Sequence, residues 1–263
     1  MTDWLGLCRS AVADVEAVLT GLPTRVEREP VVGAGLGGDD TTAIDRAAED
    51  ALLARFRDTG ATIVSEEVGV VEGGGTTLVI DPIDGSLNAK RGIPFFSVSV
   101  AVARGRTMDD VELGFVHDFG SGEEWVARRG EGAFLDGAPL GQVRPKDEIE
   151  ILSFEATLTE LVARDAPKVA ALAYRLRIMG SLALSLCHLA AGRVDAVCSL
   201  KPARSVDIAA AQLLVRELGL AIELFDVEEP FGAAPLDLTG RSRVAAAGTT
   251  DACHRVARAL SAR

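Results

Sequence analysis

The sequence predicts an α/β protein built in layers, in which a more antiparallel α+β part is followed by an α/β part. Two helical patterns open the chain, strand-like runs then fill residues 61–140, and strands alternate with helices from residue 148 onward. The sequence contains no internal repeat and no long linker. We therefore expect two tightly packed subdomains, residues 1–145 and 146–263, that form one compact unit.

The first part begins with two amphipathic helices. Apolar residues recur at helical spacing over residues 3–20 and again over 41–57, where Thr41 or Thr42 is the expected N-cap. The glycine-rich segment 31–40 between them predicts a loop. The runs that follow are apolar or alternating, which predicts strands at 61–67, 76–85, 95–103, 111–119 and 122–130 and a strand pair at 130–140.

The second part alternates strands and helices, and two of its helices stop at Gly192 and Gly219. The expected strands cover residues 148–156, 175–180, 194–200, 221–226 and 243–248. The expected helices cover residues 157–174, 181–192, 206–219 and 250–262.

Charge and composition exclude several classes of function. The 263 residues include 27 Lys and Arg against 39 Asp and Glu, which gives a formal net charge of −12. Such a surface repels nucleic acid and anionic membranes, so neither is an expected partner. It also repels a phosphorylated substrate, and bound metal would be the simplest local source of positive charge.

The cysteines and the N-terminus indicate a cytoplasmic protein. None of the four cysteines lies in a CxxC pair, which fits a reducing compartment. The N-terminal segment lacks the basic region and apolar block of a signal peptide, and no apolar run reaches transmembrane length.

The sharpest motif is DPIDGS at residues 81–86. An apolar strand delivers Asp81 and Asp84 at its carboxyl end, and the proline between them kinks the chain, which can turn both carboxylates and the Ile83 carbonyl toward one point. Such oxygen ligands suit Mg²⁺ rather than Zn²⁺. Gly85 permits a close backbone approach, and the N–H groups from there to Ser86 form a natural phosphate nest. The alternative is a plain acidic turn after a strand.

Three further acids join this hypothesis, and each has a simpler interpretation. Glu66 ends the preceding strand, so it would meet the motif if the two strands are neighbours; alone it could be a solvated turn. Asp207 opens an apolar helix and could be only its N-cap. Asp45 begins the second helix and could be an exposed helix acid.

These motifs together resemble the inositol monophosphatase superfamily of lithium-sensitive, magnesium-dependent phosphatases, over nearly the whole chain. The specific segments are SEE at 65–67, DPIDGSLN at 81–88, GEGAFLDGAPL at 130–140, GSLALSLCHLAAGRVDAV at 180–197 and VDIAAAQLLVRELG at 206–219. The resemblance implies an αβαβα sandwich of the sugar-phosphatase type. The GIPFFSVSVAVA stretch looks most like archaeal members, which are described as acting on both inositol monophosphate and fructose 1,6-bisphosphate.

The resemblance also implies a set of metal ligands. Glu66, Asp81 and the Ile83 carbonyl look like ligands of a first Mg²⁺ ion, and Asp81, Asp84 and Asp207 look like ligands of a second. Glu66 would hold a third, weaker ion through water. Mn²⁺ is a possible replacement for Mg²⁺.

Catalytic and substrate-binding roles follow from the same resemblance. Asp45 and Ser86 look like the pair that positions the attacking water, with Glu66 assisting. The residues that look like substrate contacts are Asp84, Gly85, Ser86, Gly180 and Ser181. Lys201 and Arg204 are cations where a neutral polyol needs none, so a second phosphate on the substrate would use them; the alternative is a solvated basic loop.

We therefore expect a Mg²⁺-dependent phosphomonoesterase for small sugar or polyol phosphates, namely inositol 1-phosphate, fructose 1,6-bisphosphate or both. The alternatives are a phosphatase of NADP or of adenosine 3′,5′-bisphosphate, and a catalytically degenerate binding or scaffold homologue. By resemblance we also expect a homodimer.

Overall fold

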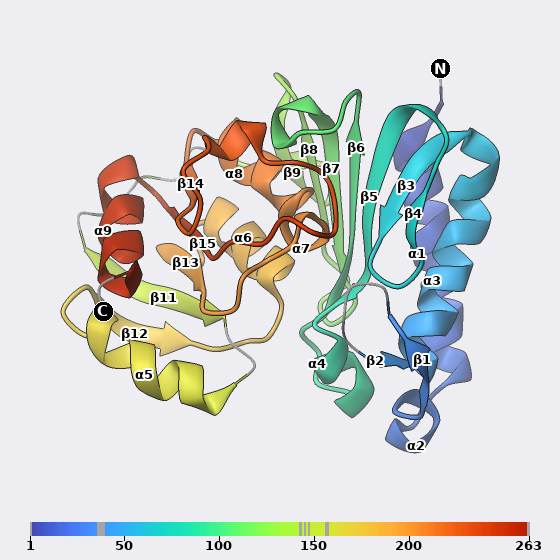
Figure 1. Ribbon diagram of the computed structural model, residues 1–263, viewed down its shortest axis with the longest axis horizontal. Coiled ribbons are helices and arrows are strands. Elements are labelled where there is room, and N and C mark those ends of the chain that lie inside the picture. Colours follow the sequence, from blue (N-terminus) through green and yellow to red (C-terminus); the bar gives the residue numbers. More distant parts are fainter. Residues whose placement is uncertain are drawn as a thin grey trace.

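The computed structural model describes residues 2–35, 40–141, 144, 146, 148–155 and 158–261. The chain is stacked in five layers, helix–sheet–helix–sheet–helix, which run from right to left in Figure 1. This arrangement confirms the αβαβα sandwich expected from the sequence. The outer helices on the first sheet are α1 (Trp4–Gly21) and α3 (Ala43–Phe56), and those on the second sheet are α5 (Thr159–Val169) and α9 (Thr250–Ser261).

The first sheet has eight strands in the order β10-β9-β8-β7-β6-β5-β3-β4. Its neighbours are antiparallel except β3 and β5, which run parallel. The carboxyl ends of β3 and β5 therefore lie at the same edge of the sheet. The bounds are β3 (Ala61–Ser65), β4 (Gly69–Val71), β5 (Gly74–Asp84), β6 (Ser97–Ala103), β7 (Val111–Asp118), β8 (Glu124–Arg128), β9 (Gly132–Leu135) and β10 (Ala138–Pro139).

The second sheet has five strands in the order β12-β11-β13-β15-β14. Strand β11 is parallel to both its neighbours, whereas β15 is antiparallel to β13 and β14. The bounds are β11 (Ile149–Glu155), β12 (Ala173–Arg177), β13 (Ala196–Ser199), β14 (Ala221–Leu224) and β15 (Val244–Ala247).

Side-chain alternation explains why helices cover both faces of the first sheet. Along β6, Val98 and Val100 belong to the apolar cluster with α1 and α3, whereas Ala101 and Ala103 belong to the cluster on the opposite face. Both faces of this strand are therefore apolar, and each needs a covering layer.

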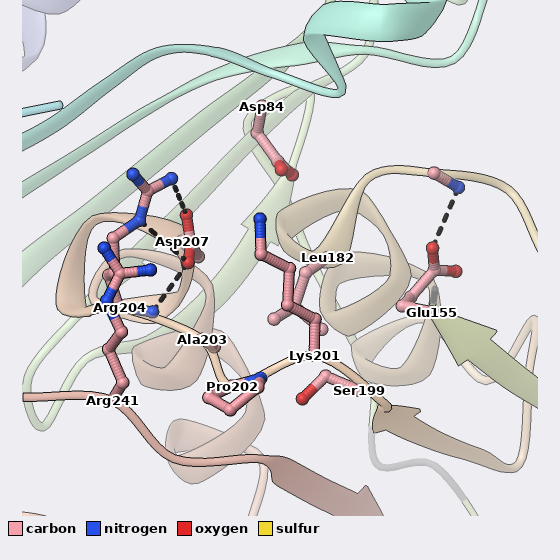
Figure 2. Close-up of a pocket in the computed structure, with 11 residues that line it drawn as sticks. Asp84, Glu155, Leu182, Ser199, Lys201, Pro202, Ala203, Arg204, Asp207 and Arg241 are labelled. Carbon is pink, nitrogen blue, oxygen red and sulfur yellow. Dashed lines mark hydrogen bonds and ion pairs between the residues drawn. The ribbon is translucent and has the colours of Figure 1, made fainter. Parts of the chain in front are cut away.

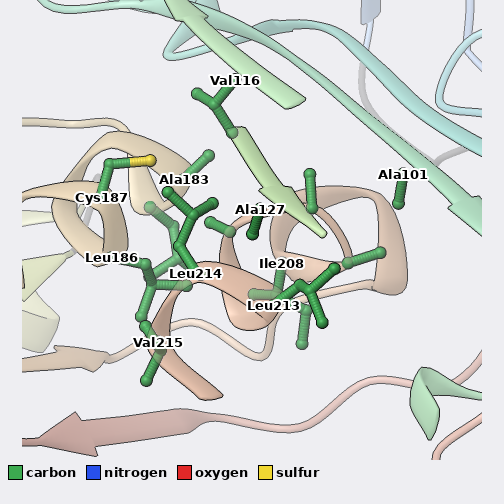
Figure 3. Packing of buried hydrophobic residues seen from close by; sticks show 14 of the residues in the cluster. Ala101, Val116, Ala127, Ala183, Leu186, Cys187, Ile208, Leu213, Leu214 and Val215 are labelled. Atoms are coloured by element: carbon green, nitrogen blue, oxygen red, sulfur yellow. The ribbon is translucent and has the colours of Figure 1, made fainter. Parts of the chain in front are cut away.

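Three helices fill the layer between the sheets: α6 (Leu182–Ala190), α7 (Ser205–Ile208) and α8 (Ala211–Glu217). Every residue of α6 except His188 is buried, and a helix that is apolar nearly all round fits only such an interior position. Figure 3 shows part of the apolar cluster in which these helices meet the first sheet, where α8 packs against β7 and β8.

The short elements at the lower end of Figure 1 correct one expectation. Residues 31–40 were predicted to be a loop, but β1 (Val31–Ala34) and β2 (Asp40–Thr42) form an antiparallel pair there. Residues 36–39 of that segment lie outside the described residues. The helices α2 (Arg25–Arg28) and α4 (Ser86–Arg91) are also additions to the predicted set.

Two boundaries in the second part were also wrong. The strand predicted at 175–180 begins at Ala173, because that residue pairs in register with Ile149 of β11. The helix predicted at 206–219 is divided into α7 and α8. The division lies against β7, where a Cβ on Gly114 would come within 2.3 Å of the Ala210 carbonyl oxygen.

Among the helices that the structure describes, none is long and apolar enough to span a membrane. The subdomain boundary near residue 145 stays a prediction, since residues 142, 143, 145 and 147 lie outside the described part of the chain.

Candidate active site

The parallel pair β3 and β5 brings the acidic motifs together. Ser65 pairs with Ile80, so Glu66 leaves β3 beside the end of β5 that carries Asp81 and Asp84. Asp81 is 2 % exposed and Asp84 is 9 % exposed. The pairing of β5 with β6 shifts register between these two acids, which is the irregularity expected at the proline kink. The convergence that the sequence predicted for these three residues is therefore present.

The second part of the chain contributes one acidic and one cationic residue to the site where Glu66, Asp81 and Asp84 meet. Asp207 lies in the first turn of α7, where its Oδ2 accepts the backbone N–H of Arg204 at 2.6 Å. The guanidinium of Arg204 lies between the two parts: Nη2 is 2.5 Å from Oε1 of Glu66 and 3.1 Å from Oδ1 of Asp207. Figure 2 shows the contact with Asp207. Arg204 is 8 % exposed, so the solvated basic loop considered for it is wrong.

The pKa values of the acids in the site are raised because several carboxylates lie close together and are shielded from water. Burial, together with repulsion from Glu66, Asp84 and Asp207, raises the pKa of Asp81 well above its ordinary value. Burial raises the pKa of Asp84 to about 7, with Asp207 adding to the shift and a hydrogen bond from Ser181 opposing it. Burial likewise raises the pKa of Glu66 to about 7, although Arg204 opposes the shift. These carboxylates therefore favour any cation that comes between them.

A pocket opens beside the acids, and its wall is cationic. Figure 2 shows Lys201 extending toward Asp84, with the side chains of Arg204 and Arg241 next to each other on the same wall. Arg241 reaches the pocket because Ala203 and Ser242 pair backbone to backbone, the Ala203 N–H lying 2.8 Å from the Ser242 carbonyl oxygen. Cations are thus concentrated at one place on an otherwise acidic chain.

Glu155 forms the opposite end of this pocket (Figure 2). Its Oε1 accepts hydrogen bonds from the hydroxyls of Ser153 and Ser185 at 2.8 and 2.7 Å, and its Oε2 accepts the Gly180 N–H at 2.8 Å. Burial raises the pKa of Glu155, against these hydrogen bonds. The carboxylate therefore fixes the backbone from which α6 begins.

The glycine and serine positions named from the sequence lie together. The Ser181 hydroxyl donates to Oδ2 of Asp84 at 2.5 Å, and the Ala183 N–H donates to the same oxygen at 2.7 Å. Gly85 has φ 90°, and a Cβ there would lie 3.1 Å from the Gly180 carbonyl oxygen. The two segments are therefore packed backbone against backbone, at a position that only glycine occupies without strain.

Asp45 is held by partners other than the predicted one. Its Oδ2 accepts from the N–H and hydroxyl of Thr42 at 3.1 and 2.5 Å and lies 3.1 Å from Nζ of Lys90. Its Oδ1 is buried without a hydrogen bond. The Ser86 hydroxyl donates to the Ile83 carbonyl at 2.9 Å, so the structure gives no hydrogen bond between Asp45 and Ser86, both of which it describes.

The donor chemistry of the site fits a hard divalent cation, but the side chains are not closed around one point. Four carboxylates and a backbone carbonyl are the oxygen ligands that Mg²⁺ accepts. Within the described part of the chain, no group of three or more Asp, Glu, His or Cys side chains is arranged to hold a metal ion. Arg204 engages two of these carboxylates and Ser181 a third, so a bound cation requires such contacts to yield.

Three residues of this region escaped the sequence analysis. Glu155 ends a strand at an acid, the same signal that identified Glu66, and could have been found. Lys90 lies within a helical turn after the motif and carries no signal of its own. Arg241 reaches the pocket only through the pairing of Ala203 with Ser242, which no local pattern reveals.

Comparison with known proteins agrees with this fold. A solved structure described as an inositol monophosphatase–fructose 1,6-bisphosphatase superposes with a TM-score of 0.86 at 27 % identity, covering 98 % of this chain and 100 % of that one. The chain thus has the fold of the inositol monophosphatase-like structures.

Sequence relatives and a family model give the narrower assignment. The fructose-1,6-bisphosphatase/inositol-1-monophosphatase of Methanothermobacter thermautotrophicus is 32 % identical over 98 % of this chain and 96 % of its own length. The Nus factor SuhB of Pasteurella multocida is 38 % identical over 69 % of this chain and 70 % of its own length. The model of the inositol monophosphatase family matches residues 11–262. The chain belongs to the inositol monophosphatase family, which confirms the resemblance and the expectation of a phosphatase at the level of the family.

Proposed function

We propose that the chain is a Mg²⁺-dependent phosphomonoesterase that hydrolyses small sugar or polyol phosphates. One observation carries the proposal: four acidic side chains from both parts of the chain meet in a buried place beside a pocket with a cationic wall. Hydrolysis of a phosphate ester requires a metal-binding site, which carboxylates can form, and a neighbouring anion-binding site, which cationic side chains can form. The family membership supports the same class of reaction.

Glu66, Asp81, Asp84 and Asp207, with the Ile83 carbonyl, would hold two or three Mg²⁺ ions, or Mn²⁺ in their place. Their mutual repulsion favours binding of positive charge. The chemistry that such ions supply is neutralisation of the phosphoryl dianion and activation of water for in-line attack.

The side chains near Asp45 would manage the proton of the attacking water. Lys90 and Thr42 hold one carboxylate oxygen, which leaves Oδ1 as the available acceptor. Ser86 would relay the proton to Asp45 after turning its hydroxyl away from the Ile83 carbonyl. The water oxygen would bond to phosphorus as the P–O bond to the leaving alkoxide breaks, and the alkoxide would take a proton from solvent water to leave as the alcohol, so no Cys, Ser or His nucleophile is needed.

The substrate would lie across the pocket. The backbone N–H groups of Gly85 and Ser86 would contact the phosphoryl oxygens, while Gly180 and Ser181 form the adjoining wall. Lys201, Arg204 and Arg241 are more cations than a neutral ring needs, and they favour fructose 1,6-bisphosphate over inositol 1-phosphate. A homodimer and a cytoplasmic location stay predictions.

A substrate panel tests the proposal. Purified protein with MgCl2 is offered inositol 1-phosphate, fructose 1,6-bisphosphate, NADP and adenosine 3′,5′-bisphosphate, and phosphate release is measured. We expect release from fructose 1,6-bisphosphate, and Asp84→Asn prepared in parallel controls for contaminating phosphatase. Lys201→Gln should raise KM for the bisphosphate more than for inositol 1-phosphate. Release from the nucleotides alone would favour that alternative substrate class.

Calorimetry separates the enzyme from the scaffold alternative. Heat of MgCl2 or MnCl2 binding to the wild-type chain is expected. Its absence, together with no phosphate release, would favour a degenerate binding protein.

A further inference from the structure

In this structure the guanidinium of Arg204 is paired with two carboxylates of the site. Its Nη2 contacts Glu66 and Asp207, and its Nε lies 3.5 Å from Oδ2 of Asp207. The side chains of all three residues are at most 17 % exposed, so these charge-assisted contacts lie largely out of water, where they are strong. One guanidinium thus balances two of the four acids of the site.

The oxygens that Arg204 engages are those that the proposed function assigns to metal. A guanidinium and a divalent cation repel each other, and Mg²⁺ demands a compact octahedral shell of oxygens at about 2.0–2.1 Å. The guanidinium of Arg204 and a Mg²⁺ ion therefore cannot bind the same oxygens of Glu66 and Asp207 at the same time.

The guanidinium is not fixed by any further partner. Its Nη1 is buried and has no hydrogen-bond partner among the residues that the structure describes. Arg204 also lines the pocket, so its side chain borders open space into which it can move (Figure 2). Release from the two acids would therefore break their contacts and little else.

We propose that Arg204 is a built-in counter-cation that a divalent ion displaces from Glu66 and Asp207, so that metal affinity is set by exchange of one cation for another. The inference rests on the proposed metal site. It makes Arg204 a residue that tunes how much divalent ion the site needs, and it adds to the substrate contact that the sequence suggested.

The test compares Mg²⁺ binding in matched variants. MgCl2 is titrated by calorimetry into the wild-type chain, Arg204→Gln and Arg193→Gln. Arg193→Gln is the control, because it removes the same positive charge from an ion pair with Glu123 at the surface. Arg204→Gln should bind Mg²⁺ about tenfold more tightly, equivalent to about 1.4 kcal/mol, because no guanidinium has to leave. It should also melt at a lower temperature than the wild type in EDTA, where the acids lack a counter-cation, and Arg193→Gln should bind like the wild type.

Each other outcome is decisive. If the wild type binds Mg²⁺ and Arg204→Gln binds it no more tightly, the exchange is wrong and the proposed function stands. If the wild type binds no Mg²⁺, the metal-dependent function and the exchange fall together.

If Arg204→Gln does not fold, ¹⁵N NMR of the wild-type chain tests the same inference. The Nε–Hε signal of Arg204 is assigned through the backbone in the ¹⁵N-labelled wild-type chain. We expect it to shift and to exchange faster with solvent in MgCl2 than in EDTA, while the signal of Arg193 stays constant. An unchanged Arg204 signal at saturating MgCl2 would overturn the inference.

Discussion

Replacing Asp84 with Asn is expected to give a protein that is more stable and yet inactive. Burial is the main cause that raises the pKa of Asp84 from 3.8 to about 7. One pKa unit corresponds to 1.36 kcal/mol, so ionised Asp84 costs the folded state about 4 kcal/mol above pH 7. The pKa of about 7 already reflects the hydrogen bonds from Ser181 and Ala183, which favour the charged form and oppose the shift. An Asn amide is neutral at every pH and removes the remaining cost, so the gain is at most about 4 kcal/mol at pH 8.

The gain should depend on pH in one direction only. Because the folded pKa lies above the unfolded one, the cost of Asp84 is absent below about pH 4 and grows until the pH passes 7. Urea unfolding in EDTA at pH 8 and pH 5 should therefore show a smaller advantage for Asp84→Asn at pH 5. Phosphate release with MgCl2 should fall by orders of magnitude.

Asp165 provides the matched control, because it is a buried acid of the opposite kind. A hydrogen bond from Arg164 lowers the pKa of Asp165 from 3.8, so Asp165→Asn should lose stability to the same extent at pH 8 and pH 5, and should lose less only as the pH falls below about 4. If Asp84→Asn were less stable than the wild type at both pH values, the argument from the burial of Asp84 would be refuted. Near-normal turnover would refute the role proposed for Asp84.

The remaining predictions concern the support of the site. Gly85→Ala should cost about 1–3 kcal/mol in urea unfolding, because its φ is positive and a Cβ 3.1 Å from the Gly180 carbonyl oxygen would force the neighbouring backbone to shift; Gly75→Ala, where a Cβ meets nothing, is the control. Lys90→Met should lower kcat about tenfold with KM unchanged, because it removes the only cation that contacts the anchored oxygen of Asp45 among the described residues and leaves that oxygen to Thr42 alone, and Lys90→Arg should retain activity. Burial raises the pKa of every thiol, so a thiol reagent should label the folded chain only after unfolding; rapid labelling of the native protein would contradict the buried positions of Cys8, Cys187, Cys198 and Cys253.

The acidic part of the site was predictable because its signals are local. Glu66 and Asp81 each end an apolar strand, and a single assumption, that the two strands are neighbours, brings them together. The cationic wall was less accessible to such reasoning. Lys201 could be named because the family resemblance marks its segment as part of the substrate site, but Arg241 depends on a backbone pairing between distant segments.

In the fold, too, features set by the local sequence could be predicted, whereas features set by contacts between distant segments could not. Helix α3 and its cap at Thr42 could be identified from spacing and from one residue type. The division between α7 and α8 could not, because it depends on the close approach of Ala210 to Gly114 in another layer. The pairing of Ala173 with Ile149, which moves the start of β12, is likewise a contact between separate strands.

Repulsion among the acids of the site opposes the packing of the two parts of the chain, and Arg204, which pairs with Glu66 across them, offsets it only in part. Asp81 and Asp84 at the edge of the first sheet face Asp207 from the inner helices, and repulsion among them raises the cost of packing these layers. The apolar cluster that joins α6, α7 and α8 to the first sheet must offset that cost. A cation that binds between the acids relieves it only in the folded chain, because the unfolded chain does not bring them together. The repulsion that weakens the folded protein is therefore also the source of its affinity for positive charge.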